Sequence, residues 1–248
     1  METYPLLSLG PLYSGFIEKR PSKHCKTPYV ADVLINEESF LGHTASLGCC
    51  GLCDKGAEVL CCKIEKKNNK CPYKVLLNKS GDNIIGIDPG LAEQLVNQIF
   101  QKNLFGNLKI KSFKTQVKYE KSRFDFSGID TNDIPFILEV KNVPPVKNNI
   151  SYFPDGFKKK KDQPVSPRAV KHLNELASLV SENQRCVICY VIQRDDSLGF
   201  SPSNDDLIYK EAFVRAVEKG VEVICLVVKW DILGNAYFIR DDLPICIN

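Results

Sequence analysis

The chain has 248 residues, of which 44% are hydrophobic and 25% charged, and its formal net charge is +3. These proportions are ordinary for a globular protein and exclude a wholly disordered chain. The apolar runs are far shorter than the ~20 residues of a membrane-spanning helix, and the N-terminus carries no secretory signal pattern. We therefore expect an intracellular protein, cytoplasmic or nuclear, with no membrane partner.

The first half of the chain alternates short β-rich runs with turn residues. We expect strands over residues 29–35, 57–64, 73–78 and 84–87, followed by a helix over 90–102 whose apolar residues share one face. Strands at such short spacing are typical of a small barrel or sandwich. The sequence thus predicts a small β-barrel over residues 1–105.

The second half follows the order strand, strand, helix, strand, helix, strand. We expect strands over 117–126, 135–143, 186–193 and 221–230, and helices that begin near 167 and 205. Ser166 and Pro167 suit the N-cap and first position of the first of these helices. Strands that alternate with helices imply parallel pairing, here beside an antiparallel hairpin. Residues 106–248 therefore read as a mixed α/β domain.

The predicted hairpin gathers charged residues on one face. A symmetric turn centred on Asn132 places residue 125 opposite 139 and residue 123 opposite 141. The core face then holds Phe124, Phe126, Phe136, Leu138 and Val140, and the other face holds Arg123, Asp125, Glu139 and Lys141. Paired carboxylates suit Mg²⁺ or Mn²⁺, and a neighbouring lysine can orient the water that attacks a phosphodiester. The same pattern also fits a solvated face with cross-strand ion pairs.

Several sequence blocks resemble, in order and spacing, the sugar fermentation stimulation protein family. They are SRFDF at 122–126, LEVKNV at 138–143, YFPD at 152–155 and KHLNEL at 171–176, and weaker likeness extends over the N-terminal half. The resemblance implies an OB-type barrel followed by a domain similar to PD-(D/E)XK nucleases. It also implies sequence-independent DNA binding and a link to the regulation of sugar metabolism.

By this resemblance, Asp125 and Glu139 match the metal ligands of the family, and Lys141 matches its catalytic lysine. The chain departs from the family pattern at Gln116, where an acidic residue is usual, and at Ser46, where an asparagine is usual. Two functions therefore stay open. One is a Mg²⁺- or Mn²⁺-dependent nuclease, and the other is a non-catalytic DNA-binding regulator that keeps the nuclease fold as a scaffold.

Basic residues suggest where nucleic acid would bind. Lysines and arginines beside the hairpin face and at the start of the following helix can neutralise phosphates, and lysines around an aromatic ring suit an OB barrel. The candidate contacts are Arg123, Lys158, Lys159, Lys160, Lys161, Arg168, Lys171, Lys66, Lys67, Lys70 and Tyr73. No sequence-reading motif is visible, so we expect binding to the backbone of DNA without sequence specificity. Each lysine also suits a solvated surface.

Eleven cysteines are the remaining unusual feature. Without an export signal, most are expected to be reduced thiols. Cys50 and Cys53 have C-x-x-C spacing, but the second such pair of a zinc site is missing, and adjacent Cys61 and Cys62 would point to opposite faces of a strand. Buried free thiols are therefore favoured over a zinc site or a thiol-redox centre.

Overall fold

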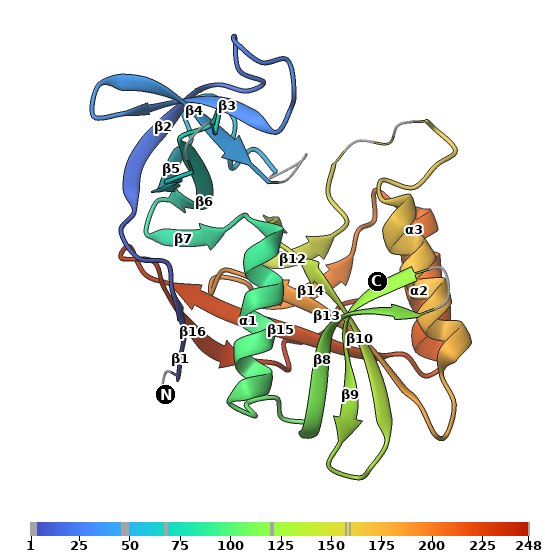
Figure 1. Ribbon diagram of the computed structural model, residues 1–248. Coiled ribbons are helices and arrows are strands. Elements are labelled where there is room, and N and C mark those ends of the chain that lie inside the picture. The colour runs from blue at the N-terminus through green and yellow to red at the C-terminus, as the bar shows by residue number, and fades with distance from the viewer. Residues whose placement is uncertain are drawn as a thin grey trace.

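The computed structural model describes residues 4–45, 50–66, 69–119, 122–156, 158 and 160–247. The chain forms a closed β-barrel, a seven-stranded mixed sheet with helices on both faces, and a small three-stranded sheet (Figure 1). The predicted architecture, a small barrel followed by an α/β domain with a mixed sheet, is confirmed. Within these ranges, no helix combines the length and apolar character needed to cross a membrane.

Five strands close the barrel. They are β2 (Tyr13–Lys19), β3 (Val30–Ile35), β4 (Glu38–Thr44), β5 (Glu58–Lys63) and β6 (Tyr73–Ser80), and β7 (Asn83–Gly86) extends the sheet beyond β6. Closure comes from β4, which pairs antiparallel with β3 and parallel with β6. The sequence does not predict β2 and β4, because both contain glycine and carry exposed polar residues in place of a continuous apolar run.

The large sheet has the strand order β1-β16-β15-β13-β10-β9-β8. Its strands are β1 (Tyr4–Ser8), β8 (Ile110–Tyr119), β9 (Ser122–Asp130), β10 (Pro135–Asn142), β13 (Arg185–Ile192), β15 (Glu222–Trp230) and β16 (Asn235–Arg240). The three central strands, β10, β13 and β15, are parallel, and β9 and β10 form the predicted hairpin. The single strand predicted over 117–126 is wrong, since that range covers the end of β8 and the start of β9, which pair with each other.

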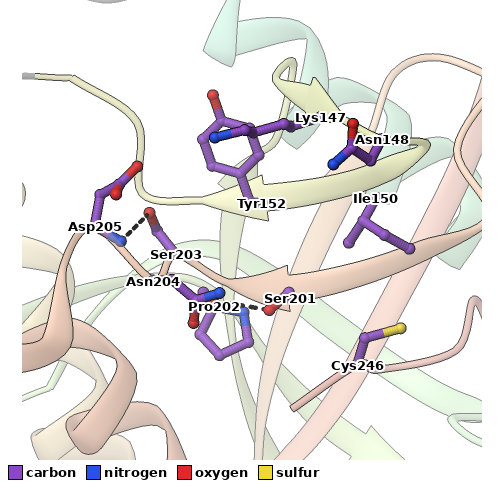
Figure 2. A pocket seen from close by; sticks show the side chains of 10 residues that line it. All are labelled: Lys147, Asn148, Ile150, Tyr152, Ser201, Pro202, Ser203, Asn204, Asp205 and Cys246. Carbon is purple, nitrogen blue, oxygen red and sulfur yellow. Dashed lines mark hydrogen bonds between the residues drawn. The ribbon is translucent and has the colours of Figure 1, made fainter. Parts of the chain in front are cut away.

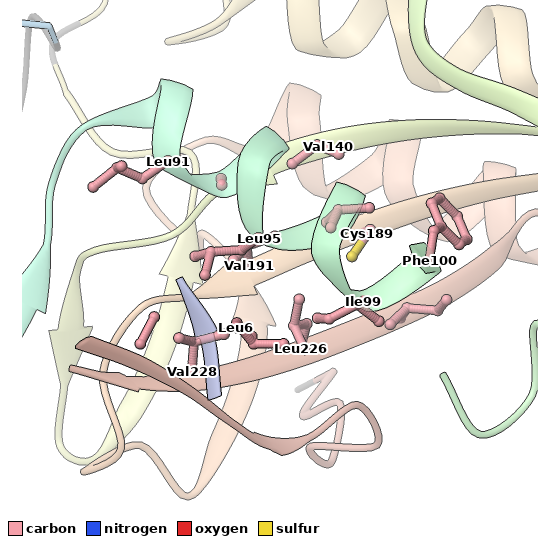
Figure 3. Close-up of a cluster of buried hydrophobic side chains, with 14 of the residues drawn as sticks. Leu6, Leu91, Leu95, Ile99, Phe100, Val140, Cys189, Val191, Leu226 and Val228 are labelled. Carbon is pink, nitrogen blue, oxygen red and sulfur yellow. The ribbon is translucent and has the colours of Figure 1, made fainter. Parts of the chain in front are cut away.

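Helices cover both faces of this sheet. Helix α1 (Pro89–Gln101) packs on one face, and α2 (Pro167–Leu179) and α3 (Leu207–Glu218) pack on the other. Figure 3 shows Leu95 and Ile99 of α1 among the side chains of Val191, Leu226 and Val228 from the sheet. The predicted cap of α2 is confirmed, because the Ser166 hydroxyl accepts a hydrogen bond from the amide of residue 169.

The chain does not divide at residue 105 into one segment that forms the barrel and another that forms the large sheet. Strand β1 pairs with β16 at the edge of the large sheet, and α1 packs against that sheet and not inside the barrel. The chain therefore starts in the large sheet, builds the barrel, and returns to the large sheet through α1. The predicted division follows the order of the sequence, whereas the packing of β1 and α1 is set by contacts with strands far along the chain.

A small sheet lies beside the large one. It contains β11 (Val146–Lys147), β12 (Ile150–Phe153) and β14 (Gly199–Pro202), with β12 parallel to β14. Ser151 and Phe200 are fully buried, whereas Tyr152 and Ser201, one position further along each strand, are partly exposed. This sheet is too short to be recognised from periodicity.

Gln193 joins the barrel to the large sheet. Its side-chain Nε2 donates to Asn142 Oδ1 at 2.8 Å, and its Oε1 accepts from Trp230 Nε1 at 3.1 Å. Its backbone carbonyl accepts from the amide of Gly86 in β7 at 2.9 Å. A Cβ atom at Gly86 would lie 2.1 Å from Gln193 Oε1, so this approach requires glycine. The buried glutamine thereby fixes where the barrel meets the sheet.

We expect Gly86→Ala to lower the free energy of unfolding by about 1–3 kcal/mol, because the added methyl group overlaps a buried side chain. Urea denaturation measures this change. Gly106→Ala is the matched control, since a Cβ there meets Asp241 at an ordinary 3.5 Å. In a Gln193→Ala background the cost of Gly86→Ala should fall but not vanish, because the contact at 2.7 Å with the Cβ of residue 193 remains. An equal cost in both backgrounds would contradict the packing argument.

Candidate functional site

A cavity of about 300 Å³ opens where α1, α2 and the strands β9 and β10 meet. Three carboxylates line it, from Glu93 on α1, Asp125 on β9 and Glu139 on β10. Lys141 and Arg168 are the basic residues of its wall. We call this cavity the acid pocket. It brings together the three residues that the sequence predicts as catalytic.

The hairpin register places Asp125 beside Glu139. The predicted register is confirmed where residues 126–129 pair with residues 135–138. Beyond that point β9 and β10 no longer pair, and Asp125 Oδ2 accepts the hydrogen bond of the Val140 amide at 2.7 Å. A side-chain carboxylate thus satisfies an amide that lies past the end of the backbone ladder. This bond holds Asp125 at the level of Glu139.

Gln116 shapes the other side of Asp125. It has a left-handed backbone with φ of 54°, in β8 between the pairs that Thr115 and Val117 make with β9. Its side-chain Nε2 donates to Glu93 Oε2 at 2.6 Å and to Asp125 Oδ1 at 3.4 Å. At the position where the resemblance implies an acid, a neutral amide therefore bridges two carboxylates.

Where the pairing of β9 breaks, its side chains no longer follow the predicted alternation between the two faces of the sheet. Phe126 packs in the core under α1, but Phe124 packs in the core under α2, with its ring 5.8 Å from that of His172. The prediction that both phenylalanines share one face is wrong. Simple alternation fails at Asp125, where the pairing of β8 with β9 skips one residue on each strand.

Glu139 is held through one oxygen only. Its side chain is buried, and Oε1 accepts a hydrogen bond from His172 Nδ1 at 2.5 Å and forms an ion pair with Lys141. The other oxygen, Oε2, is buried and has no hydrogen-bond partner among the described residues. An unpaired buried carboxylate oxygen is costly unless it binds something. Glu139 lines the acid pocket, so Oε2 is the one oxygen of this carboxylate that no described residue occupies.

The two neighbouring carboxylates have pKa values shifted in opposite directions. Burial raises the pKa of Asp125 to about 6, and the charges of Glu139 and Glu93 add to the rise. Burial also opposes ionisation of Glu139, but the His172 hydrogen bond and the Lys141 charge outweigh it and lower the pKa of Glu139. Glu139 is thus anionic at neutral pH, while Asp125 changes charge close to it.

The acid pocket has the donors that a hard cation prefers. Asp125 and Glu139 offer carboxylate oxygens, one of them unpaired, and Mg²⁺ is commonly held by one or two carboxylates together with water and substrate phosphates. In the described ranges, no group of three or more His, Cys, Asp or Glu side chains has the arrangement of a metal site. A metal here would rely on these two side chains, with its remaining positions open.

A basic hollow of about 410 Å³ adjoins the acid pocket. Arg123, Arg168 and Lys171 line it together with the start of α2, and Arg168 also lines the acid pocket. All three cationic residues are exposed, and Lys171 pairs with Glu175 at 3.5 Å. The structure thus brings these three predicted contacts together. Arg123, predicted on the face of Asp125, lines this hollow and not the acid pocket.

The other predicted nucleic-acid contacts are scattered. Exposed lysines lie after β12 and in the barrel, and they are Lys158, Lys160, Lys161, Lys66 and Lys70. Lys67, Lys159 and Ser46 lie outside the described residues.

The predicted contact at Tyr73 is wrong. Its side chain is only 7% exposed, and its ring packs between those of Tyr13 and Phe40 at 5.5 and 5.2 Å inside the barrel. Tyr73 occupies an inward position of β6, as Val75 does two residues later. A ring in the barrel interior cannot stack on a base.

Two polar residues of the site are missed by the sequence analysis. Glu93 lies on the polar side of α1, and only the packing of that helix against β10 brings it to Asp125. His172 is buried on α2, where it contacts Glu139. Its position on α2, three residues after Ala169 on the buried face, is the one signal that it points toward the sheet.

The described cysteines do not form a site. Cys53, Cys61 and Cys71 are buried, and burial raises the pKa of Cys61 to about 12, which keeps its thiol protonated. Cys61 packs inside the barrel while Cys62 packs against the core of the large sheet, so the predicted opposite facing is confirmed. Cys49 lies outside the described residues.

Comparisons with known proteins point to one family. A family model described as the sugar fermentation stimulation protein RE domain matches residues 90–233. A sugar fermentation stimulation protein homolog of Crocosphaera subtropica is 32% identical over 235 residues, which cover 90% of this chain and 91% of the relative. Another from Nostoc sp. is 33% identical over 226 residues, covering 86% and 88%.

A solved structure has the same fold. The structure of Pyrococcus furiosus SfsA in complex with Ca²⁺ matches with a TM-score of 0.83, over 98% of this chain and 100% of that one. The two sequences are 21% identical. The arrangement of barrel, large sheet and helices is therefore shared with that protein.

The pKa of Asp125 gives a prediction for stability. In an unfolded chain an aspartate titrates near pH 3.9, whereas in the folded chain the pKa of Asp125 is about 6. The folded state thus binds this proton more tightly, and ionisation between those values costs stability. We expect Asp125→Asn, measured in EDTA, to raise the free energy of unfolding by about 1–2 kcal/mol at pH 8 and to have no such effect at pH 4.

Urea titrations at both pH values measure this difference, since asparagine keeps an oxygen for the Val140 amide. Asp82→Asn, at an exposed turn, is the matched control and should change stability by the same small amount at each pH. If Asp125→Asn instead lowers the free energy of unfolding at pH 8, the charge of the Asp125 carboxylate does not destabilise the folded state and the prediction is contradicted.

Proposed function

The chain belongs to the sugar fermentation stimulation protein family, and on that premise we propose that it is a metal-dependent phosphodiesterase of the PD-(D/E)XK type that acts on nucleic acid. The observation that carries the proposal is the acid pocket. There, Asp125 and the unpaired oxygen of Glu139 lie beside Lys141. Two carboxylates and a lysine at the ends of paired strands have the chemistry that hydrolysis of a phosphodiester requires.

Asp125 and Glu139 would hold a Mg²⁺ or Mn²⁺ ion, which would supply charge stabilisation for the phosphate when bound. Glu139 is kept ionised and oriented by His172, which occupies Oε1 and leaves Oε2 without a partner among the residues that the structure describes. The Lys141 ammonium, on the same strand, is placed to hold a water molecule or a phosphate oxygen by hydrogen bonds. The Ca²⁺ in the structure of the Pyrococcus furiosus relative supports a site for a hard divalent cation.

The substrate class follows from the basic hollow. Phosphates flanking the one at the acid pocket would meet Arg168 first, because it lines both cavities, and then Arg123 and Lys171. Contacts to phosphates do not read sequence, so binding to DNA would be sequence-independent. The exposed lysines at 158, 160 and 161 add further positive charge after β12.

A second function has one observation in its favour. Gln116 places a neutral amide between Glu93 and Asp125, where another carboxylate would add to the metal affinity. A neutral residue at position 116 fits a non-catalytic DNA-binding regulator that keeps the nuclease fold as a scaffold.

Cleavage assays separate the two functions. We expect plasmid, linear duplex or single-stranded oligonucleotides to be cleaved with Mg²⁺ or Mn²⁺ and to stay intact in EDTA. Glu139→Gln and Lys141→Met should each lower the rate by at least ~100-fold, because each removes a group acting directly in the reaction. Glu182→Gln, at an exposed glutamate, is the matched control. Binding without cleavage of any substrate would favour the regulator.

Salt dependence tests the basic hollow. Removing one phosphate contact should reduce the slope of log K against log[salt] by about 0.7–0.9. We therefore expect Arg123→Gln, Arg168→Gln and Lys171→Gln each to flatten the slope by about that amount in DNA-binding titrations. Lys219→Gln, an exposed lysine that lines neither cavity, should leave it unchanged. If the slope is unchanged in all three variants, the basic hollow does not contact the phosphates of DNA.

A further inference from the structure

A second polar cavity, separate from the acid pocket, lies on the outward face of the small sheet. It has a volume of about 310 Å³, and residues of β12 and β14 line it, among them Ile150, Tyr152 and Ser201 (Figure 2). Lys147, Asn148 and Asp205 stand at its rim. We call it the sheet pocket. Its volume lies within the range of cavities that hold small organic ligands.

The strand register places several of the lining side chains on one face of the sheet. Lys147 pairs with Ile150, and Tyr152 pairs with Ser201, so these side chains share one face of the sheet. Gly199 lies next to Ile150, and a Cβ there would come within 2.9 Å of Cys246 Sγ from the C-terminal segment. The sheet thus presents the Tyr152 ring beside small and apolar surface, which suits a planar ligand.

Strand β12 separates the two cavities. Phe153, the residue after Tyr152, faces the opposite way and lines the acid pocket. Variants of Tyr152 can therefore be tested without altering a residue that lines the acid pocket.

The rim favours a ligand that donates hydrogen bonds. Asp205 lines the pocket and Asp155 lies close to the Tyr152 hydroxyl, while Lys147 is the one cationic residue among the described lining residues. Burial, together with the charges of Asp155 and Asp205, raises the pKa of Tyr152 to about 12, so the ring stays uncharged. Within the described part of the chain, the side chains of Asn148 and Asp205 make no hydrogen bond to another side chain. Both are free to bind a ligand.

We propose that the sheet pocket binds a nucleobase that carries an exocyclic amino group, with its face on Tyr152 and its edge at Asp205 and Asn148. Bases stack on aromatic side chains without regard to sequence, and a carboxylate accepts hydrogen bonds from an amino group such as that of cytosine. Lys147 adds a cation suited to the phosphate of a nucleotide, which a neutral sugar would not use. The proposal goes beyond the phosphodiesterase function and does not depend on it.

Calorimetric titration with nucleosides tests the pocket, in EDTA so that the acid pocket takes no part. We expect cytidine and adenosine to bind at least ~5-fold more tightly than uridine, which has no amino group. Tyr152→Ala should weaken their binding by about 5- to 150-fold, and Tyr152→Phe should stay within about 3-fold of the parent. Tyr29→Ala, at an exposed tyrosine of the barrel, is the matched control and should have no effect.

Asp205→Asn gives an independent readout that does not disturb the Tyr152 ring. It should abolish the preference for cytidine over uridine while leaving the melting temperature unchanged, because Asp205 is an exposed side chain. Glu139→Gln should leave nucleoside binding unaltered, which separates failure of this proposal from failure of the phosphodiesterase.

The base can come from a free nucleotide or from an unpaired position in a nucleic acid. Titration with cytidine monophosphate and with a single-stranded oligocytidine distinguishes these sources. The source is the ligand whose binding is weakened by Tyr152→Ala. Dependence of either one supports the pocket. No binding of nucleosides or oligocytidine that depends on Tyr152 would overturn the proposal. Equal dependence of glucose binding on Tyr152 would also overturn it, in favour of a general sugar site.

Discussion

The hydrogen bond from the Val140 amide to Asp125 is the contact on which the acid pocket depends. It occupies the point where β9 and β10 stop pairing, and it draws a carboxylate toward the buried Glu139. Two carboxylates so close are unfavourable, which is visible in the raised pKa of Asp125. The surrounding residues offset this cost unequally. His172 and Lys141 both act on Glu139, so one carboxylate is fixed as an anion, and the other stays sensitive to whatever enters the pocket.

The barrel contributes to that arrangement although it lies outside the acid pocket. Lys74 of β6 forms an ion pair with Asp88, which caps α1 by accepting the hydrogen bond of the Gly90 amide. Helix α1 in turn carries Glu93 to the site. The buried Gln193 makes a second connection, from β7, which extends the barrel sheet, to Asn142, the residue after Lys141. Polar contacts therefore connect the barrel side of the molecule to α1, which carries Glu93, and to β10, which carries Glu139 and Lys141.

Local pattern was enough to predict the parts of the site that belong to one hairpin. Alternation and turn symmetry alone placed Asp125, Glu139 and Lys141 together, because register in a hairpin is set by its turn. The same alternation failed for Phe124, where the strands break their pairing, and for Tyr73, where only barrel closure decides which face is inside. Glu93 and His172 reach the site through the packing of α1 and α2, and no local pattern encodes that packing. The order of helices and strands was predictable, whereas the placement of β1 in the large sheet was not, since its partner lies at the other end of the chain.

The net charge of +3 does not show that the two neighbouring cavities carry opposite charge. Three carboxylates line the acid pocket, so without a cation it repels a phosphate, while the adjoining basic hollow attracts one. Arg168 belongs to both cavities and lies where these opposing fields meet. A nucleic acid would therefore be held by the hollow whether or not a metal is bound, and only a metal between Asp125 and Glu139 would let a phosphate move from Arg168 into the acid pocket. Under the proposed function, affinity would depend mainly on the basic hollow and chemistry on the acid pocket, so loss of the metal would leave a protein that binds DNA without cutting it.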